Sequence, residues 1–117
     1  MQILQYVGDR IIELPAEALA DALARRDGAL WVDMTGPAAE DQRVLADVFG
    51  FHPLAIEDTL KQAQRPKLEE YAGYFFMTLH AVRPTNQRGG GVGLQEIDLF
   101  CAPRYVVTVH PQPVPAL

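Results

Sequence analysis

The sequence has few of the features that define disulfide-rich, membrane-spanning or nucleic-acid-binding proteins. Its 117 residues include a single cysteine, Cys101, which excludes an internal disulfide and a zinc site built from several thiolates. The longest apolar stretch, residues 74–82, is about half the length that a bilayer-spanning helix requires. Lysine and arginine number 10 against 15 aspartates and glutamates, and the resulting net charge of −5 disfavours nucleic acid as a partner, because phosphates repel an acidic surface.

Catalytic motifs are also missing from the sequence. His52, His80 and His110 show no HExxH or HxH spacing, and there is no GxSxG motif around a serine. The three glycines at 89–91 lead into a strand-like segment, and no Lys-Ser or Lys-Thr follows them, so they do not match a phosphate-binding loop. Cys101 lies in an apolar run and is expected to be a buried, inert thiol in a reducing compartment. We therefore expect no enzymatic activity.

The sequence does contain the apolar pattern of one compact domain with helices and strands. Apolar residues make up 49% of the chain and charged residues 21%, which is ordinary for a folded domain of this length. Helical spacing with proline at the start or glycine at the end alternates with short β-prone runs. The expected strands are two within 1–14, then 29–34, 74–82, 94–101 and 105–110, and the expected helices are 15–27, 37–49 and a third beginning at Pro53.

This order of segments predicts an α/β fold in which a mixed β-sheet is sandwiched by helices. Residues 74–82 have large side chains on both faces, so we expect this strand near the centre of the sheet. Residues 83–93 are expected to form a mobile hairpin loop. We assign residues 1–110 to the domain and the proline-rich residues 111–117 to a connector or the end of the chain.

The adjacent carboxylates Glu57 and Asp58 are the most suggestive acidic feature. Neighbouring residues on a helix diverge by about 100°, so the two side chains do not easily grip one small ion together. Each could instead give one ligand to an ion shared with another chain. Glu57 also precedes Lys61 by four residues, which is the spacing of a helical ion pair. From spacing alone, a solvated acidic helix face and a metal site both stay open.

One block of the sequence resembles a known family. Residues 49–58 read FGFHPLAIED and residues 64–69 read QRPKLE, which is similar to the FGxHPLxxED and QRPKxE block of CorA-type magnesium and cobalt transporters. The flanking segments WVDMTGP at 31–37 and VVTVH at 106–110 are similar to that family as well. The resemblance extends over roughly residues 29–110.

The resemblance implies an architecture and a role. CorA-type proteins are homopentamers in which a cytoplasmic N-terminal α/β/α domain precedes a long helix and two transmembrane helices with a Gly-Met-Asn motif, and this chain contains neither membrane helix nor motif. It would therefore be the cytoplasmic metal-sensing domain of such a transporter, at the inner face of the cell membrane and attached to it only through later helices. By position, Glu57 and Asp58 would contribute to inter-subunit sites for Mg²⁺, with Co²⁺ or Zn²⁺ as alternatives. The partner carboxylates would come from later segments, so we expect the site to be empty in this chain alone.

Two other interpretations remain open at this point. A zinc or other divalent-metal transporter of the same architecture would share the domain, because ion selectivity belongs to the pore. A stand-alone binding or scaffold module could also have kept the fold without a membrane part.

Overall fold

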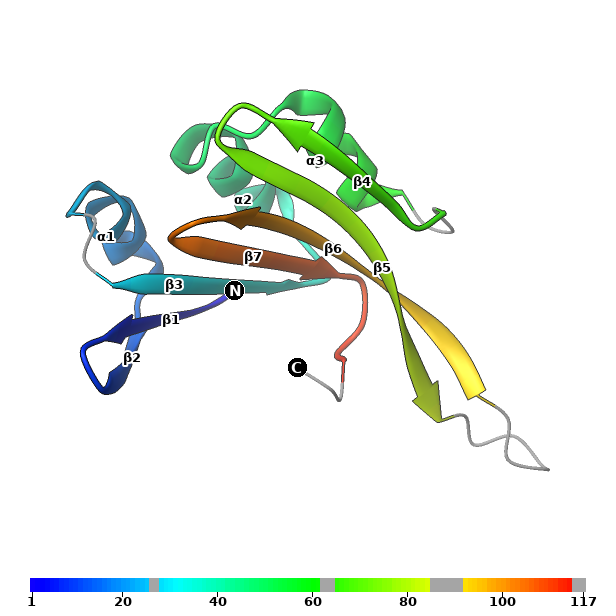
Figure 1. Ribbon diagram of the computed structural model, residues 1–117, viewed down its shortest axis with the longest axis horizontal. Helices are drawn as coiled ribbons and strands as arrows, with labels where there is room; N and C mark the ends of the chain where they lie inside the picture. Colours follow the sequence, from blue (N-terminus) through cyan, green and yellow to red (C-terminus); the bar gives the residue numbers. More distant parts are fainter. Residues whose placement is uncertain (26–27, 62–64, 85–91, 115–117) are drawn as a thin grey trace.

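The computed structural model describes residues 1–25, 28–61, 65–84 and 92–114 (Figure 1). The elements follow in the order β1 (Gln2–Val7), β2 (Arg10–Leu14), the 3-10 turn η1 (Ala16–Ala18), α1 (Leu19–Arg25), β3 (Ala29–Thr35), α2 (Ala39–Arg43), the π-helical turn η2 (Val44–Val48), α3 (Pro53–Leu60), β4 (Lys67–Tyr71), β5 (Tyr74–Pro84), β6 (Val92–Ala102) and β7 (Tyr105–His110).

The strands form one seven-stranded sheet in the order β2-β1-β3-β7-β6-β5-β4. Every neighbouring pair is antiparallel except β3 and β7, which run parallel. A parallel pair needs a long crossover, and here the crossover carries α2, α3 and the β4–β6 strands. The mixed α/β fold predicted from the sequence is therefore confirmed.

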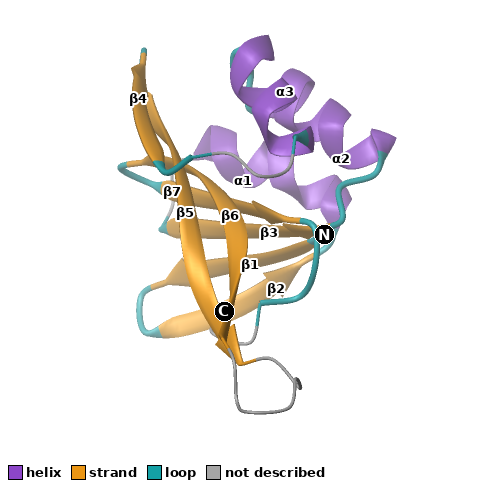
Figure 2. Ribbon diagram, turned by 90° about the vertical axis from the view of Figure 1, so that its right-hand side faces the viewer, coloured by secondary structure: helices purple, strands orange, loops and turns teal. Residues whose placement is uncertain are grey.

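The helices α1, α2 and α3 all lie on one face of the sheet (Figure 2). Strand alternation turns Val32, Met34, Val107 and Val109 toward these helices, and the positions between them face the other way. We call the side opposite the helices the open face, because no helix of the described ranges covers it. A shallow apolar groove of about 550 Å³ crosses the open face, with Tyr6, Trp31, Leu99 and Val106 among its lining residues.

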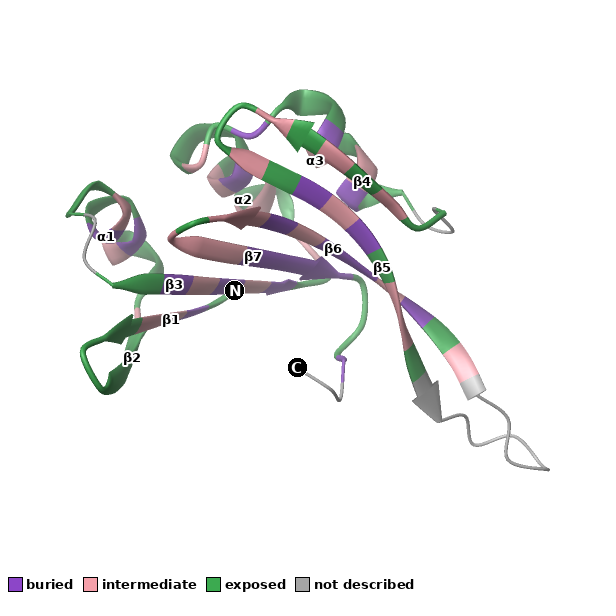
Figure 3. Ribbon diagram, in the orientation of Figure 1, coloured by how far each residue is buried: buried purple, intermediate pink, exposed green. Residues whose placement is uncertain are grey.

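The hydrophobic core lies between the helices and the central strands. Figure 3 shows the buried positions running along β3, β7 and β6, whereas β2 is mostly exposed. Phe51, just before α3, stacks on Phe100 of β6 with ring centroids 4.0 Å apart and planes 7° from parallel. Fully burying such a side chain contributes roughly 1.5–3 kcal/mol. This stack fixes the start of α3 against the sheet.

Three expectations about individual segments need correction. β5 lies one strand from the sheet edge and not at its centre, and its large residues Phe75 and Leu79 are exposed on the open face. The helix expected over 37–49 begins at Ala39 and changes to a π-helical turn at Val44. The loop expected over 83–93 is shorter, because strands reach Pro84 and restart at Val92, and its interior at 85–91 lies outside the described residues.

Candidate functional site

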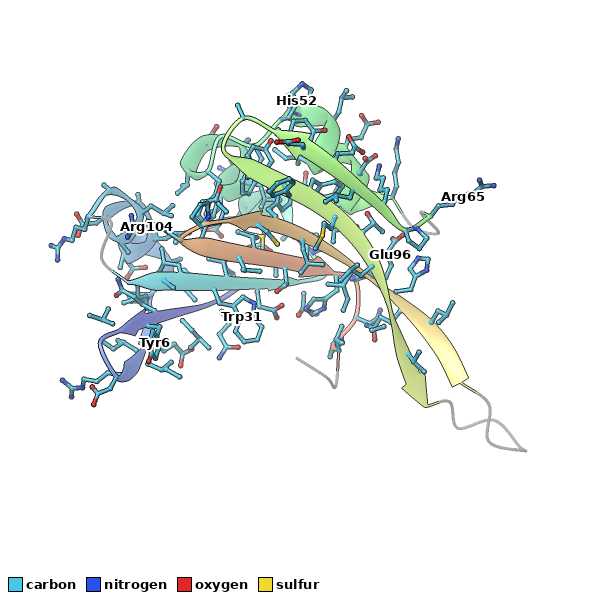
Figure 4. The ribbon with its side chains drawn as sticks, viewed as in Figure 1. Tyr6, Trp31, His52, Arg65, Glu96 and Arg104 are labelled. Carbon is cyan, nitrogen blue, oxygen red and sulfur yellow. The ribbon has the colours of Figure 1, made fainter. Side chains whose placement is uncertain are left out.

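Local sequence chemistry sets the position of α3. Gly50 adopts a φ of 71°, which reverses the chain after η2 and brings Phe51 into the core. His52 caps the helix: its Nδ1 accepts a hydrogen bond from the Leu54 N–H at 3.1 Å, and Pro53 occupies the first helical position. The backbone N–H of His52 donates to the Tyr74 hydroxyl at 2.8 Å, which ties the helix start to β5. His52, labelled in Figure 4, thus has a local structural role at the start of α3.

The two predicted acidic residues separate on α3. Glu57 points outward, with 57% of its side chain exposed, and its Oε1 lies 3.4 Å from the Lys61 Nζ in the i, i+4 pair that the spacing predicts. Asp58 turns toward the sheet and has only 17% of its side chain exposed. The divergence expected of adjacent helical residues is therefore observed.

Asp58 has a partner that the sequence reasoning did not find. Lys67 of β4 donates from Nζ to Asp58 Oδ2, and the same Nζ lies 3.0 Å from Glu69 Oε1. The ammonium also sits 5.7 Å from the centroid of the Phe76 ring. The hydrogen bond to Asp58 is the main reason that the pKa of Lys67 is raised, against the opposing effect of burial.

A second carboxyl group lies beneath this ion cluster. Asp98 of β6 is 3% exposed and accepts a hydrogen bond from Thr78 Oγ1 at 2.9 Å. The strand register places Lys67 opposite Thr78 and Thr78 opposite Asp98, so the three form one row across β4, β5 and β6. Burial raises the pKa of Asp98 to about 7, and the nearby charges of Glu96 and Asp58 add to the rise. The sequence contains no signal for this buried carboxyl group, because a single Asp in a strand of alternating residues is ordinarily exposed.

Within the described part of the chain, these carboxylates do not form a complete metal centre. Their oxygens are the ligand type that Mg²⁺ and Ca²⁺ prefer. Among residues 1–25, 28–61, 65–84 and 92–114, however, no group of three or more His, Cys, Asp or Glu side chains is placed to hold an ion.

A separate polar network on the open face joins the C-terminal ends of the parallel strands β3 and β7. His110 is 2% exposed; its Nε2 lies 2.7 Å from Asp33 Oδ1, and its Nδ1 lies 2.6 Å from the Gln112 carbonyl oxygen. Thr108 Oγ1 donates to the same Asp33 oxygen at 2.5 Å and accepts from Trp31 Nε1 at 3.0 Å. Asp33 and His110 lie 77 positions apart, so only the β3–β7 pairing brings them together.

Cys101 and His80 complete the positions singled out in the sequence. Cys101 is half-buried, and burial raises the pKa of its thiol, which disfavours the reactive thiolate. His80 Nε2 lies 3.9 Å from Glu96 Oε1 across the β5–β6 pair. Neither observation gives Cys101 or His80 a place in the candidate site around Asp58.

Comparison with known proteins identifies the family. Residues 26–117 match the model of the CorA-like Mg²⁺ transporter protein family, and the chain belongs to that family. YfjQ of Bacillus subtilis, whose name describes a metal ion transporter, is 40% identical over 87 residues, which cover 74% of this chain and 26% of the relative. The cobalt/magnesium transport protein CorA of Thermotoga maritima is 34% identical over 83 residues, covering 68% of this chain and 23% of that protein.

Solved structures agree with the fold. The CorA magnesium transporter of Methanocaldococcus jannaschii superimposes with a TM-score of 0.71 at 16% identity, covering 99% of this chain and 34% of that one. The full-length CmaX protein gives a TM-score of 0.68 at 23% identity, covering 98% of this chain and 35% of that one. The chain thus spans about a quarter of the length of the two curated relatives named above. In the part that the structure describes, no helix has the length and apolar character needed to cross a bilayer.

Proposed function

We propose that this chain is the metal-sensing domain of a CorA-like divalent-cation transporter and supplies Glu57 and Asp58 to sites shared between subunits. The observation that carries the proposal is the position of this acidic pair in a chain of the CorA-like family. Both residues lie on α3 of the helical layer, and Glu57 is open to a neighbouring chain. The regulatory ion is Mg²⁺, with Co²⁺ as the alternative that the name of the Thermotoga maritima relative supports.

The mechanism is ligand linkage across a subunit boundary. Two carboxylates brought within about 4 Å of each other repel by about 4 kcal/mol at an effective dielectric constant near 20. A divalent cation between them converts this repulsion into a bridge, and Mg²⁺ needs only a few carboxylates because it keeps several of its waters. High metal concentration therefore holds neighbouring domains together and favours a closed pore, and low concentration releases them.

The assembly needed for this mechanism lies beyond the present chain. We propose a homo-oligomer, a pentamer by resemblance to the CorA family, in which this domain lies at the cytoplasmic face of the membrane. The donors that complete each site come from later segments of the neighbouring subunit. This requirement agrees with the incomplete carboxylate set around α3 in the described residues of one chain.

The test is metal-dependent thermal stability of the full-length protein in detergent. A ligand that binds only the folded assembly stabilises it by about 2.7 kcal/mol at a hundred times its dissociation constant. We expect Mg²⁺ to raise the unfolding temperature of the wild type, D58N to lose most of that rise, and D47N to keep it. Asp47 is an exposed residue of η2 and provides the same change of charge on a different helical segment. An equal response of D58N and D47N would refute the proposal.

A further inference from the structure

We propose that Lys67 is a built-in competitor for the regulatory cation: its ammonium occupies Asp58 in the metal-free domain and must leave when a divalent ion binds there. This inference rests on the proposed function of Asp58. It adds a residue that sets the metal concentration at which the domain responds.

The first argument is the geometry of the ammonium group. Lys67 Nζ contacts carboxylates from two different elements, Asp58 of α3 and Glu69 of β4. The side chains of Lys67 and Asp58 are 29% and 17% exposed, so water screens their pair less than it screens an ion pair on an open surface. A positive charge thus already lies on the inner side of α3, at the carboxylate through which Asp58 would bind a metal ion.

The second argument is that the Lys67 ammonium also joins strand β4 to helix α3. Among the described strands, β4 lies at the sheet edge and pairs with β5, and the Lys67–Asp58 contact joins it to α3. A divalent ion at Asp58 weakens the attraction of that carboxylate for Lys67 and leaves Glu69 as the remaining charged partner among the described contacts. Metal binding at the subunit boundary would therefore loosen α3 from β4 within the same subunit. The two events are thermodynamically linked, so strengthening one weakens the other.

Glu69 provides a change of opposite sign. Its carboxylate shares the ammonium with Asp58 and also accepts the Tyr71 hydroxyl at 3.0 Å. Glutamine at this position keeps an oxygen for Tyr71 and removes the charge, so Lys67 becomes more fully committed to Asp58. The competitor model then requires that K67M lowers, and E69Q raises, the Mg²⁺ concentration that the assembly needs.

The experiment measures the Mg²⁺ concentration for half-maximal thermal stabilisation of the full-length protein. An ion pair worth about 1 kcal/mol corresponds to about fivefold in affinity. We expect K67M to lower the half-maximal concentration about fivefold, E69Q to raise it, and K67R, which keeps the charge, to stay near the wild type. K61M removes the exposed partner of Glu57 and serves as the matched lysine control, with a smaller change.

The outcomes separate this inference from the function on which it rests. If D58N abolishes the Mg²⁺ response while K67M and E69Q leave the half-maximal concentration unchanged, Lys67 only stabilises the packing of α3 against β4. The competitor model is then wrong. If D58N itself keeps the wild-type response, the proposed function fails, and the competitor model fails with it. Should K67M prevent folding, E69Q and K67R still decide, because an E69Q value at or below that of the wild type contradicts the model.

Discussion

Replacing Asp98 with asparagine should change how the stability of the domain depends on pH. Asp98 is buried on β6, and its pKa is raised from 3.8 to about 7, chiefly by burial. Because the folded pKa is above the unfolded value, the folded state binds a proton between these two values that the unfolded state has lost. Stability is therefore full at acidic pH and falls as the pH rises toward 7.

The size of the effect follows from the same shift. One pKa unit corresponds to about 1.4 kcal/mol, so ionised Asp98 lowers the free energy of unfolding by about 4 kcal/mol once the pH exceeds its folded pKa. Asparagine does not ionise, and its side-chain oxygen can still accept the hydrogen bond from Thr78. We expect the stability of D98N relative to the wild type to increase by about 2–3 kcal/mol between about pH 5 and about pH 8.

Urea unfolding at a series of pH values measures this difference. Trp31, the single tryptophan, reports unfolding by fluorescence, and titrating groups that do not interact with Asp98 contribute equally to both proteins. D47N, at an exposed position, should run parallel to the wild type. Parallel pH profiles for D98N and the wild type would refute a raised pKa at Asp98.

Three further predictions concern packing and ion pairs. F51A removes a stacked core ring and should lower the free energy of unfolding by about 3–5 kcal/mol in urea, whereas a loss below about 1 kcal/mol would contradict the core assignment. H110A removes one of the hydrogen bonds to Asp33, which Thr108 still contacts, and should cost about 1–3 kcal/mol in the same assay; an unchanged midpoint would show that the network is not structural. K61M breaks only the exposed pair with Glu57 and should shift stability by less than about 0.5 kcal/mol, which a double-mutant cycle with E57Q checks.

Periodicity predicted most of the local elements, although β4 and the π-helical turn η2 were not among them. The mixed sheet, the start of α3 at Pro53 and the Glu57–Lys61 pair all depend on spacings of a few residues, and each is present in the structure. The position of β5 was not predictable in this way. Large side chains on both faces suggested a central strand, but those on the open face are exposed in this chain.

The unpredicted parts of the candidate site are all long-range pairs. Lys67 reaches Asp58 only because β4 returns along the sheet edge beneath α3. Asp98 meets Thr78 through the register of the β5–β6 hairpin, which a one-residue slip would turn to the other face. Charge pairs set by strand order and register give no signal in a spacing pattern, and this is why the Lys67–Asp58 pair was not predicted.

The open face is the side of the sheet on which the sequence led us to expect a second layer of helices. Figure 4 shows Tyr6 and Trp31 on the side of the sheet away from His52 and the helical layer. The second helical layer expected of an α/β/α sandwich is not among the described elements of this chain, which spans about a quarter of YfjQ and of the Thermotoga maritima CorA protein. The expectation of a mixed sheet with helices was thus met by helices on a single face.

The decisive measurement is the location of a divalent cation in the full-length assembly. Crystals of the complete protein soaked with Co²⁺ would reveal bound ions by anomalous scattering. Our account predicts a peak at the subunit boundary within coordination distance of Asp58 or Glu57, with Lys67 turned away from Asp58 wherever that carboxylate is a ligand. Ions found elsewhere in the assembly, with both carboxylates unliganded and Lys67 still on Asp58, would contradict it.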